Sequence, residues 1–400
     1  MSKIVVENLY KIFGPTPDKA MRMLSSGATK ADIMEKTKHG VGVNNVSFSV
    51  EEGELVVVMG LSGSGKSTLV RCINRLIEPT AGSVFIDGTN VTKLDAGGLR
   101  KLRQEKLGMV FQNFALFPHR TVAQNAEYGL EIAGVPADIR RKKAIQALEV
   151  VGLSGWEDQL PAQLSGGMQQ RVGLARALAL DPDILLMDEA FSALDPLIRR
   201  DMQDELINLQ QQMHKTIVFI SHDLDEALKL GDRIVLMKDG EIIQVGTPED
   251  ILTSPADDYV ARFVENADIS QVLTAESVMK KSEAAAFLKT DGPRAALRKM
   301  RTNAIYRLFA LDEEHRVVGV LSADGCRDLL TQGEKDLRKA MIPDPITVTP
   351  ETPANELIQI IHDLPYPLAV VNEDKKLKGV IVRGMLLAAL AEGGNIDADS

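Results

Sequence analysis

A glycine-rich segment between an apolar run and a helix-like stretch places the strongest constraint on the fold of this 400-residue chain. Five consecutive apolar residues at positions 55–59 lead directly into Gly60-Leu61-Ser62-Gly63-Ser64-Gly65-Lys66-Ser67-Thr68. A short apolar run followed by the pattern G-x-x-x-x-G-K-[ST] and a helix is typical of a phosphate-binding loop. The sequence therefore predicts an α/β domain with a buried strand at residues 55–59, since such loops connect a parallel strand to the helix after it.

Two further segments narrow the class of protein. Residues 164–167 read Leu-Ser-Gly-Gly, and the apolar residues 184–187 are followed by Asp188 and Glu189. The glycines introduce a stretch that we predict to be helical from about residue 168 to residue 180, so they offer a second helix N-terminus that suits an anion. The acidic pair comes at the end of a predicted strand, where ligands of α/β sheets bind.

Together the three motifs resemble those of the ATP-binding cassette (ABC) ATPases. The resemblance implies ATP and Mg²⁺ as ligands and a second copy of the chain as partner. It also implies two sites between the copies, each joining the glycine loop of one copy to the Leu-Ser-Gly-Gly segment of the other. The expected nucleotide-binding residues are Phe13, Gly60, Ser62, Gly63, Ser64, Gly65, Lys66, Ser67, Thr68, Ser165, Gly166, Gly167 and Asp195.

Hydrolysis of a nucleoside triphosphate requires charge neutralisation, a bound magnesium ion and an oriented water molecule. Lys66 would neutralise the β- and γ-phosphates, and Ser67 would offer its hydroxyl to magnesium. Asp188 would hold the ion directly or through water. Glu189, one residue further, is interpreted as the general base that polarises the attacking water.

The resemblance adds Gln112, which follows a predicted strand, and His222, which follows the strand predicted at residues 216–220. In this family the glutamine reaches magnesium and water, and the histidine contacts the γ-phosphate. Asp223 and Glu226 have the spacing of a helix capping box and are interpreted as structural. The predicted catalytic residues are thus Glu189, His222 and Gln112, and the predicted magnesium ligands are Ser67, Gln112 and Asp188.

Two positions keep alternative interpretations. Asp195 precedes Pro196, which is the pattern of a helix N-cap, whereas the resemblance implies that this segment crosses the dimer interface. Phe13 stands where the family places an aromatic ring against adenine, but Tyr10 is a second candidate, and either ring could instead belong to the core.

The order of the segments predicts two domains. Residues 1–267 alternate strand-like and helix-like stretches, with a hairpin at Asp239-Gly240 and an inserted helical subdomain at about residues 113–165. An extra segment of helical character, residues 15–39, interrupts the first hairpin. We expect a linker at residues 268–276, a second domain at residues 277–393 and an acidic tail at residues 394–400.

The second domain repeats itself at an offset of 60 residues. Pro293 matches Pro353, Leu308 matches Leu368, and Gly319-Val320 matches Gly379-Val380. Each copy, at about residues 277–335 and 337–393, reads helix, strand, acidic turn, strand, helix, and paired copies imply a shared core. This pattern resembles a tandem cystathionine-β-synthase (CBS) module. The predicted fold class is therefore an α/β P-loop ABC nucleotide-binding domain with a helical subdomain, followed by an α+β tandem CBS module.

The composition excludes several classes of protein. The hydrophobic content of 44% and charged content of 26% are ordinary for a globular protein. No run of 18 apolar residues occurs, and the first residues are typical of a strand and not of a signal peptide. A net charge of −10 argues against nucleic acid as a partner. The cysteines, Cys72 and Cys326, are expected to be buried in a reducing compartment.

Across nearly the whole chain the sequence resembles the ATPases of glycine betaine/proline importers. The resemblance implies a subunit at the cytoplasmic face of the inner membrane that hydrolyses ATP to energise solute import. It implies separate permease subunits and, indirectly, an exported solute-binding protein. The alternatives are the ATPase of another amino-acid or quaternary-amine importer, and a regulatory protein that senses nucleotides through its CBS module.

Two segments suggest how such a subunit would contact the permease and the membrane. Residues 113–119, after Gln112, carry apolar and aromatic side chains that could receive a short permease helix, or could simply pack within the helical subdomain. Arg294, Arg298 and Arg301 lie on one helical face and could rest on anionic lipid. There are two alternatives for the second domain. This helix face could simply be solvated, or a nucleotide could bind between the two repeats.

Overall fold

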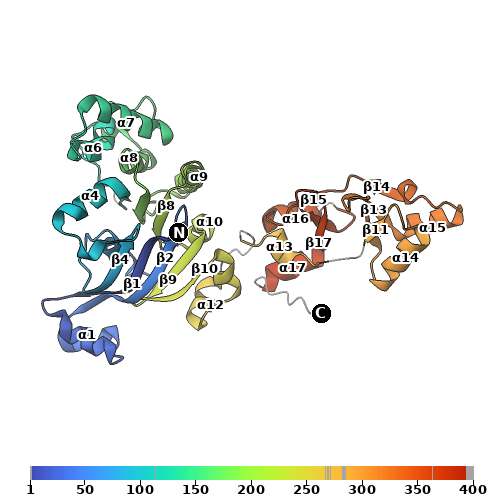
Figure 1. Cartoon of the computed structure of the whole chain (residues 1–400), viewed down its shortest axis with the longest axis horizontal. Helices are drawn as coiled ribbons and strands as arrows, with labels where there is room; N and C mark the ends of the chain where they lie inside the picture. Colours follow the sequence, from blue (N-terminus) through green and yellow to red (C-terminus); the bar gives the residue numbers. More distant parts are fainter. Residues whose placement is uncertain are drawn as a thin grey trace. The chain divides into compact units, whose positions relative to one another are not determined.

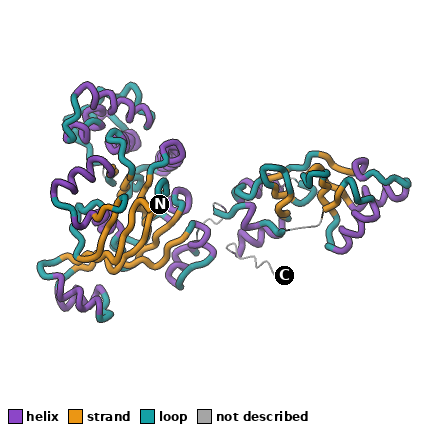
Figure 2. The backbone as a smooth tube through the Cα atoms, viewed as in Figure 1, coloured by secondary structure: helices purple, strands orange, loops and turns teal. Residues whose placement is uncertain are grey.

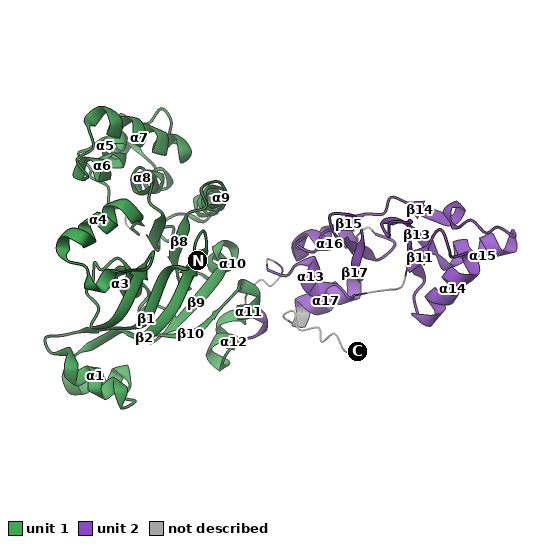
Figure 3. Ribbon diagram, viewed as in Figure 1, with its two compact units in different colours: residues 1–251, 255–265 green, residues 252–254, 266–400 purple. Residues whose placement is uncertain are grey.

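The structure is a computed structural model that describes residues 2–112, 114–265, 267, 270, 272–281, 285–362 and 364–392. The chain forms two compact units, residues 1–251 with 255–265 and residues 252–254 with 266–400 (Figures 1 and 3). The expected acidic tail, residues 394–400, lies outside the described residues, as do positions 268, 269 and 271 of the expected linker. Within the described part of the chain, no helix has both the length and the apolar character that crossing a membrane requires.

A six-stranded sheet forms the centre of the first unit (Figure 2). Its order is β10-β9-β3-β8-β7-β6, with every neighbouring pair parallel except β9 and β10. The strands are β3 (Leu55–Met59), β6 (Leu107–Val110), β7 (Ile184–Asp188), β8 (Thr216–Ser221), β9 (Arg233–Lys238) and β10 (Glu241–Gly246). The strands β3, β7 and β8 are buried along their whole length, and the sequence of β3 and the inner residues of β7 and β8 are apolar, as predicted.

A four-stranded antiparallel sheet, in the order β2-β1-β4-β5, packs against the same core. Its strands are β1 (Ser2–Phe13), β2 (Gly40–Glu51), β4 (Ala81–Ile86) and β5 (Thr89–Asn90). Ile4, Val6 and Leu9 of β1 are buried with Val56 and Val58 of β3, so one hydrophobic core joins the two sheets. Burial within this core raises the pKa of the Cys72 thiol to about 12. Both cysteines are buried, as predicted.

The helices of the first unit follow the predicted order. The predicted helical subdomain contains short helices and α7, and the segment after it forms α8 with Ser165 as N-cap. The helix α8 begins at Gly166, two residues earlier than predicted. The helices are α3 (Lys66–Ile73), η1 (Val91–Lys93), α4 (Ala96–Lys106), α5 (Val122–Ala126), α6 (Tyr128–Ile132), α7 (Ala137–Val150), η2 (Pro161–Gln163), α8 (Gly166–Leu178), α9 (Pro196–Met213), α10 (Leu224–Leu230), α11 (Pro248–Thr253) and α12 (Asp258–Val264).

The extra segment between β1 and β2 forms two helices, α1 (Pro17–Ser25) and α2 (Lys30–Thr37). A complete capping box between Thr29 and Asp32 starts α2. Ala20 and Ile33 from the two helices pack with Ile12 and Val41 of the flanking strands in a small core of their own. The segment, which we call the insertion, is therefore an ordered part of the first unit.

The second unit contains the two predicted repeats. The first comprises β11 (Ala285–Phe287), α14 (Pro293–Thr302), β12 (Arg307–Leu311), β13 (Val317–Ser322) and α15 (Ala323–Thr331). Residues 337–343, at the start of the predicted second repeat, form η4 (Leu337–Ala340) and β14 (Met341–Pro343), and β14 pairs with β13 of the first repeat. The second comprises β15 (Thr347–Val348), α16 (Ala354–His362), β16 (Leu368–Val371), β17 (Leu377–Ile381) and α17 (Arg383–Glu392). Phe309 and Val320 of the first repeat share a hydrophobic cluster with Ala369 and Val371 of the second, which confirms the shared core.

A short helix before the first repeat belongs to the core of the second. The helix α13 (Ala275–Val278) buries Ala275 and Val278 with Leu357 and Leu368 of the second repeat. The backbone of Thr274 also bridges to Pro353. The helix α13 thus packs on the second repeat although the first repeat follows it in the sequence, because the apolar side of α13 is complementary to the second repeat.

Candidate nucleotide site

The glycine loop joins β3 to α3 through a backbone that only glycine adopts readily. Gly60, Gly63 and Gly65 have positive φ values of 144°, 81° and 106°. A Cβ placed on Gly60 would lie 2.1 Å from the carbonyl oxygen of Met237, and one on Gly65 would lie 2.2 Å from that of Gly42. The glycines are thus required both for the curl of the loop and for its close packing on neighbouring strands.

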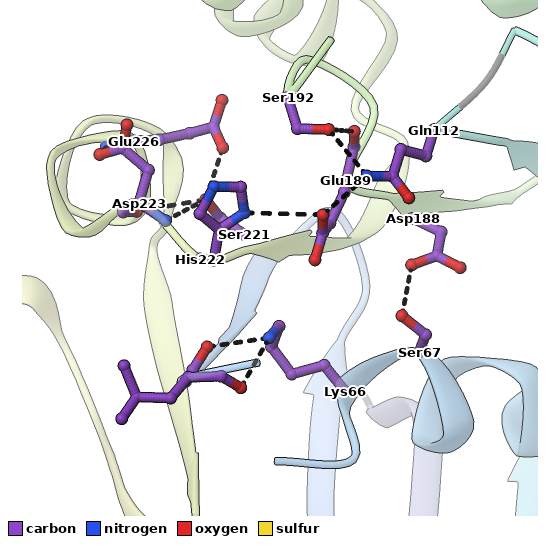
Figure 4. A network of polar contacts seen from close by, with 12 residues as sticks. Lys66, Ser67, Gln112, Asp188, Glu189, Ser192, Ser221, His222, Asp223 and Glu226 are labelled. Carbon is purple, nitrogen blue, oxygen red and sulfur yellow. Dashed lines mark hydrogen bonds and ion pairs between the residues drawn. The ribbon is translucent and has the colours of Figure 1, made fainter. Parts of the chain in front are cut away.

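Lys66 opens α3 with its side chain folded back over the loop (Figure 4). Its ammonium donates to the carbonyl oxygens of Gly60, at 2.8 Å, and Leu61, at 3.2 Å. Burial lowers the pKa of Lys66, while the charges of Glu189 and Asp188 raise it. The ammonium lies at the centre of the loop, and both acceptors are neutral carbonyl groups that an incoming phosphate could replace.

Asp188 ends β7 with its carboxylate against the first turn of α3. Its Oδ1 accepts a hydrogen bond of 2.8 Å from the Ser67 hydroxyl, and its Oδ2 lies 3.0 Å from the guanidinium of Arg71. Asp188 is buried, whereas the Arg71 side chain is 45% exposed. The structure therefore brings the two strongest predicted magnesium ligands, Ser67 and Asp188, into direct contact.

Glu189 lies one residue past β7 and meets two of the residues that the resemblance had singled out. Its Oε2 accepts a hydrogen bond of 3.0 Å from Gln112 and lies 3.6 Å from Nδ1 of His222 (Figure 4). Gln112 also donates to the hydroxyl of Ser192 at 3.2 Å. The φ of Glu189 is +47°, which is unusual for a residue with a side chain. This backbone turns the carboxylate toward Gln112 and His222.

The capping box predicted at Asp223 and Glu226 is only half formed. Asp223 caps α10 by accepting a hydrogen bond from the Glu226 amide. The Glu226 carboxylate, however, accepts from the hydroxyl of Ser221 at 2.5 Å and from Gln203 at 3.1 Å, so it does not return to the helix start. Burial raises the pKa of Glu226. The prediction of a reciprocal cap was wrong, because a tertiary partner satisfies this carboxylate.

Ser165, Gly166 and Gly167 lie together at the start of α8, and Ser165 and Gly166 are exposed. A Cβ placed on Gly167 would lie 2.4 Å from Ile198, so this helix N-terminus packs directly on the start of α9. Among the described residues, no hydrogen bond or ion pair joins residues 165–167 to the glycine loop. Asp195 caps α9 through a hydrogen bond from the Ile198 amide, which confirms the N-cap interpretation.

Phe13 and Tyr10 occupy different surroundings. A Cβ placed on Gly42 would lie 2.8 Å from the Phe13 ring and 3.0 Å from the methyl group of Thr68. Phe13 is therefore the ring that adjoins the first helical turn after the loop, and 44% of it is exposed. Tyr10 pairs instead with Ala81 of β4 and is half-buried.

The polar partners that fix these side chains were not predicted from the sequence. Arg71 holds Asp188 across 117 positions of sequence, and Ser192 receives Gln112 across 80. Arg71 follows Ser67 by one helical turn, and this spacing was the only signal in the sequence that could have suggested it. No local pattern in the sequence indicated Ser192, since its contact with Gln112 depends on the strand order.

The chain is similar to known proteins over its whole length. A family model described as "ABC transporter" matches residues 43–192, and one described as "CBS domain" matches residues 335–392. The glycine betaine transport ATP-binding protein OpuAA of Bacillus subtilis is 53% identical over 97% of this chain and 92% of that protein. The glycine betaine/carnitine transport ATP-binding protein GbuA of Listeria monocytogenes is 53% identical over 98% of both.

A solved structure supports the same assignment for the first unit. The ATP-binding cassette MJ0796, described as a dimer in a post-hydrolysis state bound to ADP and Pi, superposes with a TM-score of 0.52. The two chains are 34% identical, and the match covers 61% of this chain and 98% of the MJ0796 chain. The predicted fold class, an α/β ABC domain followed by a CBS module, is confirmed.

Proposed function

This chain belongs to the glycine betaine transport ATP-binding proteins of the ABC transporter family, and from that premise we propose that it energises the import of glycine betaine or a related compatible solute. The protein is an ABC-type ATPase that works with membrane subunits. We propose that it acts as a dimer, held at the cytoplasmic face of the membrane by a separate permease, with an exported protein that delivers the solute. The observation that carries the proposal is the convergence of Lys66, Ser67, Asp188, Glu189 and His222 at one edge of the sheet.

The residues around the loop fit a triphosphate and a magnesium ion. The Ser64 hydroxyl is buried without a hydrogen-bond partner among the described residues, and a Cβ on Gly60 would lie 2.9 Å from it. The loop therefore contains a buried donor that a phosphate oxygen could satisfy. Ser67 and Asp188 offer a hydroxyl and a carboxylate oxygen, the hard donors that Mg²⁺ prefers.

In the proposed reaction, bound magnesium supplies charge neutralisation of the phosphates. Lys66 would exchange its two carbonyl acceptors for phosphate oxygens, and Ser67 and Asp188 would hold the metal. Glu189 would accept a proton at its Oε2, which Gln112 already contacts, from a water molecule. The oxygen of that water would bond to the γ-phosphorus as the bond from the γ-phosphorus to the bridging oxygen breaks and ADP leaves. His222, on the other side of the same oxygen, contacts the γ-phosphate.

The dimer would complete each site. We propose that Ser165, Gly166 and Gly167 bind the γ-phosphate of ATP held by the partner subunit, because they form an exposed helix N-terminus away from the loop of their own chain. Asp195, which is exposed beside them, would contact the partner as well. Phe13 would stack on adenine, since its ring adjoins Thr68.

Substitution of Lys66 tests the proposed function. Lys66→Ala should lower ATP binding and reduce the rate of phosphate release by about a hundredfold or more. Lys142→Ala, an exposed lysine of α7, is the matched control and should leave both unchanged. Circular dichroism and the melting temperature would verify folding, and Lys66→Arg would separate the loss of charge from the loss of geometry. Normal hydrolysis by folded Lys66→Ala would refute the site.

A further inference from the structure

The start of β2, which follows the insertion, contacts the glycine loop. The carbonyl oxygen of Gly42 lies so close to Gly65 that a Cβ there would come within 2.2 Å of it. The same oxygen would lie 3.1 Å from a Cβ placed on Gly240, whose amide donates to the carbonyl oxygen of Ser64 in the loop. Side chains that reach Gly42 or Gly240 therefore reach the surroundings of the glycine loop.

Two side chains of α2 reach this region. The Lys30 ammonium lies 3.3 Å from the position of a Cβ on Gly240. The Met34 methyl lies 3.7 Å from the position of a Cβ on Gly40, and the Cβ of Phe13 lies 4.0 Å from the same point. Since Lys30 and Met34 are four residues apart on one helix, they share a face. That face is directed toward the strand on which Phe13 lies.

Neither side chain is satisfied within its own chain. Lys30 is half-buried, and among the described residues its ammonium makes no hydrogen bond or ion pair. The charges of Asp239 and Glu241 attract it, but burial outweighs them and lowers the pKa of Lys30. Met34 is 49% exposed beside Phe13, which is 44% exposed. A partly desolvated ammonium next to exposed apolar groups suits a ligand that has both hydrogen-bond acceptors and an apolar face.

We propose that Lys30 and Met34 of the insertion form part of the site for the nucleoside of ATP, beside Phe13. The Met34 thioether and the Phe13 ring offer contact to a purine, because sulfur and aromatic groups both pack well on a π-face. The Lys30 ammonium donates a hydrogen bond to an acceptor of the nucleoside, either a ribose hydroxyl or a ring nitrogen. This inference rests on the proposed function, since it requires the phosphates to lie at the glycine loop.

The insertion is held firmly enough to present these side chains. His39 is buried at its end, where Nε2 accepts a hydrogen bond of 3.3 Å from the Thr16 amide and Nδ1 lies 2.7 Å from the carbonyl oxygen of Thr37. Ile33 of α2 is fully buried in the small core of the insertion. Lys30 and Met34 are outside that small core, so truncating either should leave the insertion folded.

The test compares binding of a nucleotide with binding of its phosphates alone. Lys30→Ala and Met34→Ala are titrated by calorimetry with a non-hydrolysable ATP analogue and with inorganic tripolyphosphate. Loss of one hydrogen bond or one apolar contact should weaken binding of the nucleotide by about three- to tenfold. Binding of tripolyphosphate should not change. Lys36→Ala removes the same charge from an exposed position of α2 and should bind both ligands normally.

The outcomes separate this inference from the proposed function. If the two variants bind the nucleotide as the unsubstituted protein does, the insertion takes no part in the site. If Lys30→Ala weakens the nucleotide and tripolyphosphate equally, Lys30 acts on the phosphates and the inference is wrong. If Lys66→Ala still binds both ligands normally, the proposed function itself fails, whatever Lys30 does.

Discussion

Glu189 has the least favourable backbone of the residues assigned to chemistry. Its φ of +47° places it in the left-handed region, which costs a residue with a side chain about 1–3 kcal/mol. The neighbours of Glu189 enforce this conformation, because Asp188 is fixed by Ser67 and Arg71 and the Glu189 carbonyl oxygen accepts from the Ser192 hydroxyl. This backbone conformation holds the carboxylate between Gln112 and His222, where the proposed hydrolysis requires a general base.

Replacing this carboxylate by an amide should separate binding from turnover. Glu189→Gln keeps the size of the side chain but cannot accept a proton, so we expect ATP to bind and hydrolysis to fall by about 10²- to 10⁴-fold. Phosphate release measures the rate, and size-exclusion chromatography would detect an ATP-bound dimer that no longer dissociates. The exposed Glu149→Gln of α7 is the control. Unchanged turnover in Glu189→Gln would exclude Glu189 as the base.

The segment after Gln112 is the element best placed to report on the site. Phe114 and Ala115 both have positive φ values, of 52° and 50°, and their carbonyl oxygens accept hydrogen bonds from Arg176 of α8. Leu116 follows, half-buried. Asn113, the first residue of this segment, lies outside the described residues.

We expect this segment to dock a short helix of the permease. Leu116→Asp should reduce copurification with the permease or abolish stimulation of ATPase activity by solute, because a charge would enter an apolar contact. Ile139→Asp, at a 45% exposed position of α7, is the control. Solute-stimulated activity that persists in reconstituted vesicles would place the docking surface elsewhere.

The helix α14 carries the basic face predicted from the sequence. Arg294, Arg298 and Arg301 are exposed, and no ion pair to them occurs among the described residues. The neighbouring Lys299 differs, since it pairs with Asp291 at 2.7 Å. Three exposed cations on one helix can be attracted to anionic headgroups by about 1 kcal/mol each, and this attraction weakens as salt rises.

Removing the three charges should therefore change the salt dependence of transport. Arg294, Arg298 and Arg301 are replaced together by Gln, and the transporter is reconstituted with its permease in vesicles of fixed anionic lipid content. The internal salt concentration needed for activation should fall. Replacing Lys375, Lys376 and Lys378 by Gln removes an equal charge from exposed positions near β17 and should leave the threshold unchanged. Equal thresholds in both variants would contradict regulation through α14.

For the whole molecule, the proposed function requires a second copy of the chain to complete each nucleotide site. The exposed start of α8 lies beside the start of α9, where Asp195 is exposed and Leu197 is 73% exposed. These features support the proposed dimer with sites formed from both subunits.

A charge at the start of α8 tests that arrangement. Ser165→Glu would place a carboxylate against the γ-phosphate bound by the partner, so hydrolysis should fall by about a hundredfold or more while binding of ATP at Lys66 remains measurable. Ser165→Ala is the matched control, because it also removes the N-cap, which costs about 1 kcal/mol, without adding a charge. Normal hydrolysis by Ser165→Glu would exclude a partner phosphate at this position.

The sequence by itself determined the features whose causes are local. The loop at residues 60–65, the buried strands β3 and β8 and the hairpin at Asp239-Gly240 follow from glycine conformation, apolar runs and turn chemistry within about ten residues. The two repeats were visible as well, because equal structures require similar patterns of apolar residues.

Tertiary structure alone decided which distant groups meet. Strand order brings Arg71 to Asp188 and Ser192 to Gln112, and it gives the Glu226 carboxylate to Ser221 and Gln203 in place of the predicted cap. The insertion likewise reaches Gly240 only because β2 lies beside the glycine loop. Such contacts depend on the packing of several elements at once, and no short stretch of sequence contains that information.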